Sequence, residues 1–223
     1  MNIVEMHLYF RELAQQAGMQ TVRAILPEDI DINLNVAIRD IVKRIVKENT
    51  KAIDGNTKVA RDNSKISQLN SLRSLYRQED LTGSGNGSQT NPYKININTN
   101  NVLLFTGFKT IDDGHLYDAR IIEIEELGMT LNDFCNRAEY DAPICTVIGS
   151  YSSIKVDFYT GPVQGRAPQN VRVYYIAEPA VVCHPDVGGQ VDCDLIDYLH
   201  EDVVKLAVDY YLKAIANTNI TRS

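Results

Sequence analysis

The sequence predicts an α+β fold, with N- and C-terminal helices packed together and a mainly antiparallel β module inserted between them. Apolar residues recur at three- and four-residue spacing near both ends of the chain, as on one face of a helix. A Gly/Ser/Asn-rich stretch at 83–92 then precedes segments rich in β-branched and aromatic residues. We therefore divide the chain into an N-terminal helical layer at 1–82, a β-rich module at 93–182 and a C-terminal helix at 192–217 that returns to the helical layer.

Two helices are expected in the first fifty residues. The first spans 3–18, and its apolar stripe consists of Met6, Phe10, Leu13 and Ala17. The second begins at Pro27, a residue suited to the first helical position, with acidic residues in its first turn: Glu28, Asp29 and Asp31. Its apolar face consists of Ile30, Leu34, Ala37, Ile38, Ile41 and Ile45. A weaker helical pattern covers 65–77.

The C-terminal helix is predicted from an apolar stripe and an acidic start. The stripe consists of Ile196, Leu199, Val203, Leu206, Ala207, Tyr210 and Ala214. Asp192, Asp194 and Asp197 lie near the expected first turn, where carboxylates cap free N–H groups. Such a helix has to bury its apolar face, and the N-terminal helices are its expected partners.

The β module is predicted from short runs of strand-forming residues. The expected strands are 93–98, 102–108, 116–125, 144–148, 154–159 and 171–177, and a short helix capped by Thr130 is expected at 130–138. The strands at 154–159 and 172–176 are expected to be antiparallel, joined by an extended tip at 161–170. Because the tip has little apolar content, we expect it to contact a partner through Val163, Gln164, Arg166 and Gln169.

Charge is unevenly distributed along the chain. Residues 1–80 hold 12 Lys/Arg and 11 Asp/Glu, whereas residues 81–223 hold 10 and 18. The acidic module disfavours general binding to nucleic acid. Arg39, Lys43 and Lys47 share the polar face of the second helix, where they could contact an acidic neighbour, nucleic acid or only solvent. No signal peptide or membrane-spanning run is expected.

No catalytic, cofactor or metal site is predicted. Gly83–Gly87 lacks the strand before and the helix after that a dinucleotide-binding loop needs, so a flexible loop is the favoured interpretation. Cys183, His184, Cys193 and His200 lack the short paired spacings of a zinc site. The four His residues are scattered, and the acidic run at 192–202 leads into a helix rather than a calcium loop. The chain is therefore not expected to be an enzyme.

Two helical segments carry a family resemblance. The segment PEDIDINLNVAI at 27–38 resembles a helix start found near the N-terminus of neck proteins in tailed bacteriophages. The segment DYLHEDVVKLAV at 197–208 is similar to the closing helix of such proteins, particularly in crAss-like phages. About 25 residues carry the likeness, together with the helix–β–helix order.

The resemblance implies a virion structural protein without enzymatic activity, made in the bacterial host cytoplasm and located in the neck or tail region. It implies a homo-oligomeric head-to-tail connector ring, expected to be twelve-fold, that binds the portal protein and other neck or tail rings. DNA would pass through the channel without sequence-specific binding, and no membrane is involved. The alternatives are a tail-terminator or decoration subunit, and a cellular binding module or an enzyme.

Overall fold

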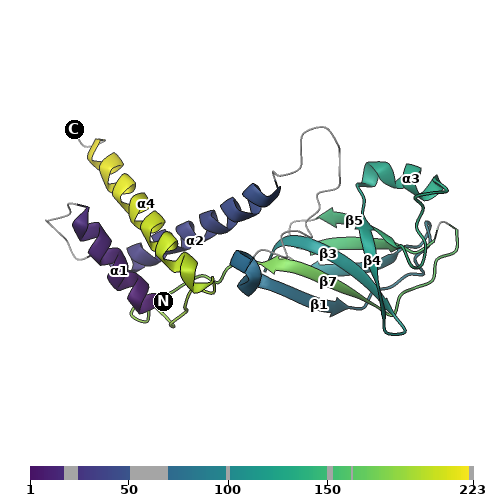
Figure 1. Ribbon diagram of the computed structural model, residues 1–223, viewed down its shortest axis with the longest axis horizontal. Helices are drawn as coiled ribbons and strands as arrows, with labels where there is room; N and C mark the ends of the chain where they lie inside the picture. Colours follow the sequence, from purple (N-terminus) through teal and green to yellow (C-terminus); the bar gives the residue numbers. More distant parts are fainter. Residues whose placement is uncertain (18–24, 51–69, 99–100, 150–152, 162, 221–223) are drawn as a thin grey trace. The chain divides into compact units, whose positions relative to one another are not determined.

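The computed structural model describes residues 1–17, 25–50, 70–98, 101–149, 153–161 and 163–220; the side chains of 48–50 and 217–220 are not described. These residues form two compact units. The helical unit contains the described residues before 51, residues 70–75 and the chain from Pro179 onward, and the sheet unit contains Tyr76–Glu178. The predicted α+β class is confirmed (Figure 1).

In the helical unit, helices α1 (Ile3–Gln16) and α2 (Pro27–Thr50) pack against α4 (His200–Ile220). Helix α1 begins with a capping box, in which the Asn2 side chain accepts from Glu5 N and the Glu5 side chain accepts from Asn2 N. The side chains that face the core of this unit include Met6, Phe10, Ile30, Leu34, Ile38, Val203 and Ala207. The stripe of α1 differs from the prediction, because His7 and Ala14 are buried while Ala17 is exposed.

The C-terminal helix begins at His200, after a 3-10 turn, η3 (Asp197–Leu199). The prediction that Asp192 and Asp194 cap this helix is wrong. Asp192 Oδ1 accepts from Ile3 N at 2.9 Å and so caps α1, while Asp194 Oδ2 accepts from Ala180 N at 3.1 Å. Both carboxylates therefore bind segments distant from them in sequence, which spacing along one helix does not indicate.

The sheet unit is built on seven strands in the spatial order β1-β7-β3-β4-β5-β6-β2, and only the β4–β5 pair is parallel. The strands are β1 (Tyr76–Leu81), β2 (Tyr93–Asn98), β3 (Val102–Asp112), β4 (His115–Ile121), β5 (Ile144–Gly149), β6 (Ser153–Tyr159) and β7 (Asn170–Ala177). The parallel pair requires a crossover connection, and this connection contains helix α3 (Ile124–Asn132).

The sheet curls around one apolar core. Phe108 of β3 and Phe158 of β6 meet edge to face with ring centroids 5.9 Å apart, although two strands lie between them in the sheet order. Val171 and Val173 of β7 join the same cluster as Tyr93, Ile95 and Ile97, the inward residues of β2. Strands from opposite ends of the order thus share a core, which a flat sheet would not allow.

Four predictions for the middle of the chain differ from the structure in whole or in part. A helix was predicted at 65–77, but residues 70–75 form a 3-10 turn, η2 (Asn70–Leu75), and strand β1 follows it directly. Residues 65–69 of this prediction lie outside the described residues. The segment 116–125 changes from strand to helix at Ile124, and α3 ends at Asn132, where Thr130 donates to the Glu126 carbonyl instead of capping a new helix. Strands β6 and β7 do not pair with each other: β6 lies between β5 and β2, and β7 between β1 and β3.

The Gly-rich stretch at 83–92 is a packed turn of the sheet unit rather than a flexible loop. Gly83 N donates to the Tyr93 hydroxyl at 2.7 Å, and Thr160 N donates to the Gly87 carbonyl at 2.8 Å. Gly87 has a φ of +77°, and a Cβ on Gly165 would lie 2.2 Å from the Gly87 carbonyl carbon. Two glycines are therefore needed where this turn meets the segment after β6.

Candidate functional site

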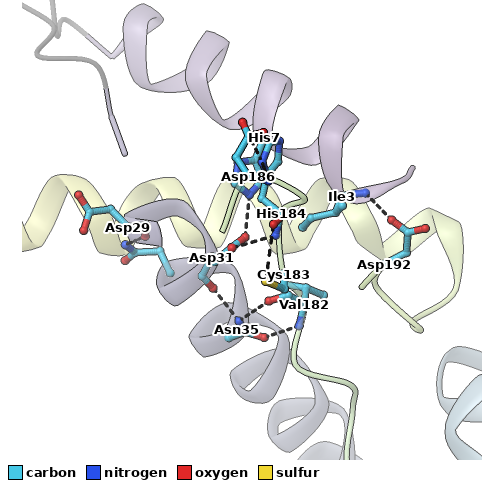
Figure 2. A network of polar contacts seen from close by, with 11 residues as sticks. Ile3, His7, Asp29, Asp31, Asn35, Val182, Cys183, His184, Asp186 and Asp192 are labelled. Carbon is cyan, nitrogen blue, oxygen red and sulfur yellow. Dashed lines mark hydrogen bonds and ion pairs between the residues drawn. The ribbon is translucent and has the colours of Figure 1, made fainter. Parts of the chain in front are cut away.

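The most developed polar cluster of the chain lies in the helical unit and centres on Asp31 of α2 (Figure 2). His7 of α1 places its Nε2 2.8 Å from Asp31 Oδ1, and the backbone N–H of His184 donates to Asp31 Oδ2 at 2.9 Å. Because an ionised carboxylate only accepts, His7 donates through Nε2. One buried carboxylate thus connects two helices to the segment that precedes α4.

The two imidazoles of the cluster stack on each other, with ring centroids 4.4 Å apart. Burial lowers the pKa of His7, and the bond to Asp31 opposes this effect. His184 and Arg11 lower the pKa of His7 further through their charge. No hydrogen-bond partner lies near His7 Nδ1 among the described residues, so a second proton on the ring would be buried without an acceptor. The cluster therefore favours neutral His7.

Further bonds attach the segment 179–192, called the strap here, across α1 and α2. The Asn35 side chain donates to the Val182 carbonyl at 3.0 Å and accepts from Val182 N at 2.9 Å (Figure 2). Asp192 caps α1 through Ile3 N, and this bond lowers the pKa of Asp192. The strap is thereby fixed to both N-terminal helices by polar side chains at three successive points.

The geometry favours a structural role for this cluster. The His7 side chain is 1% exposed and that of Asp31 is 9% exposed, so a substrate has no access to either. Of the residues considered for zinc, His200 donates through Nε2 to the Leu195 carbonyl, and His184 Nδ1 accepts from Asp186 N. No group of three or more His, Cys, Asp or Glu side chains could hold a metal ion within the part of the chain that the structure describes.

Sequence reasoning missed this cluster. Asp31 was expected in the first turn of a helix, where an acidic residue already has a local explanation, and His7 was noted only as one of four scattered histidines. Its position on the buried stripe of α1, one residue after Met6, was the available signal. The partner of Asp31 is 24 residues away and the strap contact 153 residues away, distances at which spacing carries no information.

Two of the predicted tip residues hold the segment after β6 to its own unit. Arg166 pairs with buried Asp112 at 2.6 Å and lies over the Tyr140 ring, 4.6 Å from the centroid. The backbone N–H and carbonyl of Arg166 both bind Thr160 Oγ1, and the side chain of Gln169 donates to Asp113. Val163, 81% exposed, and Gln164 point to solvent. Among the predicted contact residues of the tip, Val163 and Gln164 are therefore the two without a bond to the sheet unit in the described structure, and the side chain of Arg166 stays partly exposed.

The predicted basic residues of α2 are exposed, and two apolar residues extend their row. Ile32 and Val36 are 62% and 45% exposed, and the spacing places them in line with Arg39 and Lys43. Lys47 continues this line toward the end of the helix. We call Ile32, Val36, Arg39 and Lys43 the α2 stripe.

A second exposed apolar region lies on α3 in the sheet unit. Met129 is 80% exposed on the outer side of α3, whereas Leu131 on the inner side packs with Ile144 of β5 and Tyr159 of β6. Ile124, at the first residue of the helix, is 52% exposed and lies on the side of Leu131. Glu125 and Glu126 lie next to Met129 on the outer side, at four and three residues' distance. We call Glu125, Glu126, Gly128 and Met129 the α3 face. Sequence reasoning missed it because the β-branched run at 121–124 was interpreted as strand.

No family model matches the chain, and no curated protein matches it. Within the described residues, no helix has the length and apolar character required to cross a bilayer.

Proposed function

We propose that the chain is a head-to-tail connector subunit of a tailed bacteriophage, which assembles into a closed ring between portal and tail. The observation that carries the proposal is the resemblance of 27–38 and 197–208 to the neck-protein helices. The helix–sheet–helix order of the chain supports it. In this proposal the ring is a homo-oligomer, expected to be twelve-fold, and DNA passes through it without sequence-specific contact.

The positions of the two resembling segments support the proposal further. The first contains Asp31, Leu34 and Ile38, which belong to the buried side of α2. The second contains Leu199, Val203 and Ala207 on the buried side of α4, and α2 packs on α4. The likeness therefore covers two elements that form one core, so it describes a packing arrangement rather than two isolated helices.

The exposed surfaces are compatible with assembly. A heterologous ring needs two different faces on each subunit, and the chain exposes apolar side chains on both units. These include Leu8, Ile32 and Val36 in the helical unit and Met129, Phe134 and Val163 in the sheet unit. Apolar side chains exposed to this degree on a helix are typical of interfaces with other proteins when they lie close together.

The experiment is to locate the chain in phage particles. Tailed particles are purified, their proteins are identified by mass spectrometry, and the chain is located by antibody labelling in the electron microscope. We expect label at the neck and a copy number that matches one ring. Label over the whole capsid would indicate a decoration subunit, and label at the distal end of the tail tube would indicate a different tail component. Absence of the chain from particles would contradict the proposal.

A further inference from the structure

The α2 stripe and the α3 face each combine exposed apolar residues with charge, and the charges have opposite sign. The stripe runs from Ile32 and Val36 to Arg39 and Lys43 on the side of α2 opposite its buried residues. Over the 11 residue steps from 32 to 43 it is about 16 Å long. The buried side of α2, from Ile30 to Val42, packs inside its own unit, and the stripe faces away from this core.

The α3 face has the complementary character. Between residues 123 and 141 the sequence has six acidic residues and one basic residue. Glu125 and Glu126 flank Met129 on the outside of the helix, and the nine residues of α3 span about 13 Å. The two surfaces are therefore opposite in charge, and both expose apolar side chains.

Gly128 provides an independent observation at the same place. Glycine within a helix costs about 1 kcal/mol relative to alanine. A Cβ on Gly128 would meet no atom within 4 Å, and its φ is not in the left-handed region, so the fold of the chain itself does not require a glycine there. The missing side chain leaves room at this point for another helix to come close to α3.

We propose that copies of this chain associate head to tail, with the α2 stripe of one copy lying on the α3 face of the next. The inference rests on the proposed ring and specifies the contact between its neighbouring subunits. Ile32 and Val36 would pack against Gly128 and Met129, and Arg39 and Lys43 would face Glu125 and Glu126. Because the two surfaces differ, the contact is heterologous and can close into a ring.

Charge reversal tests the contact. The full chain is compared with R39E/K43E, with E125K/E126K and with the chain that carries all four changes, by sedimentation across a concentration series. Each double variant should weaken association about tenfold or more, because like charges then face each other, and the quadruple variant should recover it. Lys205→Glu, on the exposed side of α4 where Lys205 pairs with Glu201, is the matched control and should have no effect.

Cross-linking tests which surfaces meet. In a Cys135→Ser background, which removes an exposed thiol near α3, a Val36→Cys chain is mixed with a Met129→Cys chain and treated with a short bismaleimide. A linked pair is expected for this mixture and not for Val36→Cys mixed with Leu116→Cys, an exposed apolar position on β4. The parent chain without an introduced cysteine reports any linkage through Cys183 and Cys193.

The outcomes separate this inference from the proposed function. If the chain assembles but charge reversal and cross-linking have no effect, the contact is wrong and the ring proposal stands. If the chain stays monomeric at every concentration and is also absent from particles, both are contradicted. Recovery in the quadruple variant supports the contact, because damage to either helix alone could not be repaired by a change on the other.

Discussion

Each unit buries an aspartate, and the two aspartates have different partners. Asp31 in the helical unit is bonded to His7 and to the His184 backbone, both of which are buried. Asp112 in the sheet unit pairs with Arg166, whose side chain is 62% exposed. Solvent therefore reaches the Arg166 partner of Asp112, whereas the partners of Asp31 are shielded from it. The helical unit therefore contains a buried polar cluster beside its apolar core, whereas the ion pair of the sheet unit holds a surface segment.

The largest effect is expected in the apolar core of the sheet. Phe158→Ala removes a fully buried ring that contacts Phe108, and should lower the free energy of unfolding by about 3–5 kcal/mol. Phe134→Ala, which removes an 80% exposed ring, is the control and should change it by less than about 0.5 kcal/mol. Chemical denaturation followed by near-ultraviolet circular dichroism measures both. Similar losses in the two variants would show that this cluster is not the core.

The second-largest effect is expected for Asp31→Ala, which should destabilise the helical unit and leave the sheet unit unchanged. Asp31→Ala leaves the His7 Nε2–H and the His184 N–H buried without an acceptor, at a cost of about 2–4 kcal/mol. Hydrogen exchange should accelerate in α1, α2 and α4 and stay unchanged in the strands. The exposed neighbour Asp29, changed to Ala in the same helix, is the control. Unchanged exchange in the Asp31 variant would contradict the role given to the cluster.

The pH dependence of the helical unit follows from His7. The pKa of His7 is lower in the folded chain than its ordinary value of 6.5, so below this value the unfolded chain binds more protons. Stability is therefore full above about pH 6.5 and falls as the pH decreases from there toward the folded pKa, by at most about 1.4 kcal/mol per pH unit. Asp31, His184 and Arg11 act on the His7 ring, and Asp186 contacts the His184 ring that stacks on it.

The measurement is hydrogen exchange in α1 and α2 at pH values on both sides of 6.5, corrected for the intrinsic exchange rate. His7→Gln, which can still donate to Asp31, should reduce the dependence. If the variant shows the same pH dependence as the native chain, another group is responsible.

The smallest effect is expected at the exposed pair. Arg166→Ala should cost less than about 1 kcal/mol, because an exposed arginine contributes little and water can reach Asp112 in its absence. Proteolysis of the segment around Arg166 should nevertheless become faster, since the variant loses the Asp112 pair and the contact with Tyr140. Lys155→Ala, on the exposed side of β6, is the control. If Arg166→Ala lowered the free energy of unfolding as much as Asp31→Ala does, the proposed difference between the Asp112 and Asp31 sites would be wrong.

The sequence predicts elements well where one side of an element is buried and the other is not. Strand β2 was predicted with its observed bounds, because Tyr93, Ile95 and Ile97 alternate with polar residues. The start of α2 at Pro27 was also predicted correctly. Both patterns are local, so they can be recognised in the sequence without knowing which element packs against the strand or the helix.

Elements defined by their partners were missed. Strand β1, with the sequence YRQEDL, has no apolar alternation, and it is held at the sheet edge by pairing with β7, including the ion pair between Asp80 and Arg172. The separation of β6 from β7 depends on the order of seven strands. Asp31 and the strap meet across 153 residues. Each of these features is determined by a contact between residues far apart in the sequence, and the periodicity of apolar residues does not predict such contacts.

The most direct test of the central proposal is the mass of the purified chain in solution. Native mass spectrometry across a concentration series should show one closed oligomer, expected to contain twelve copies of the 25.0 kDa chain, and electron microscopy should show it as a ring. Tailed particles should carry the same ring at the neck. A monomer at every concentration, together with absence of the chain from purified particles, would contradict the proposed connector.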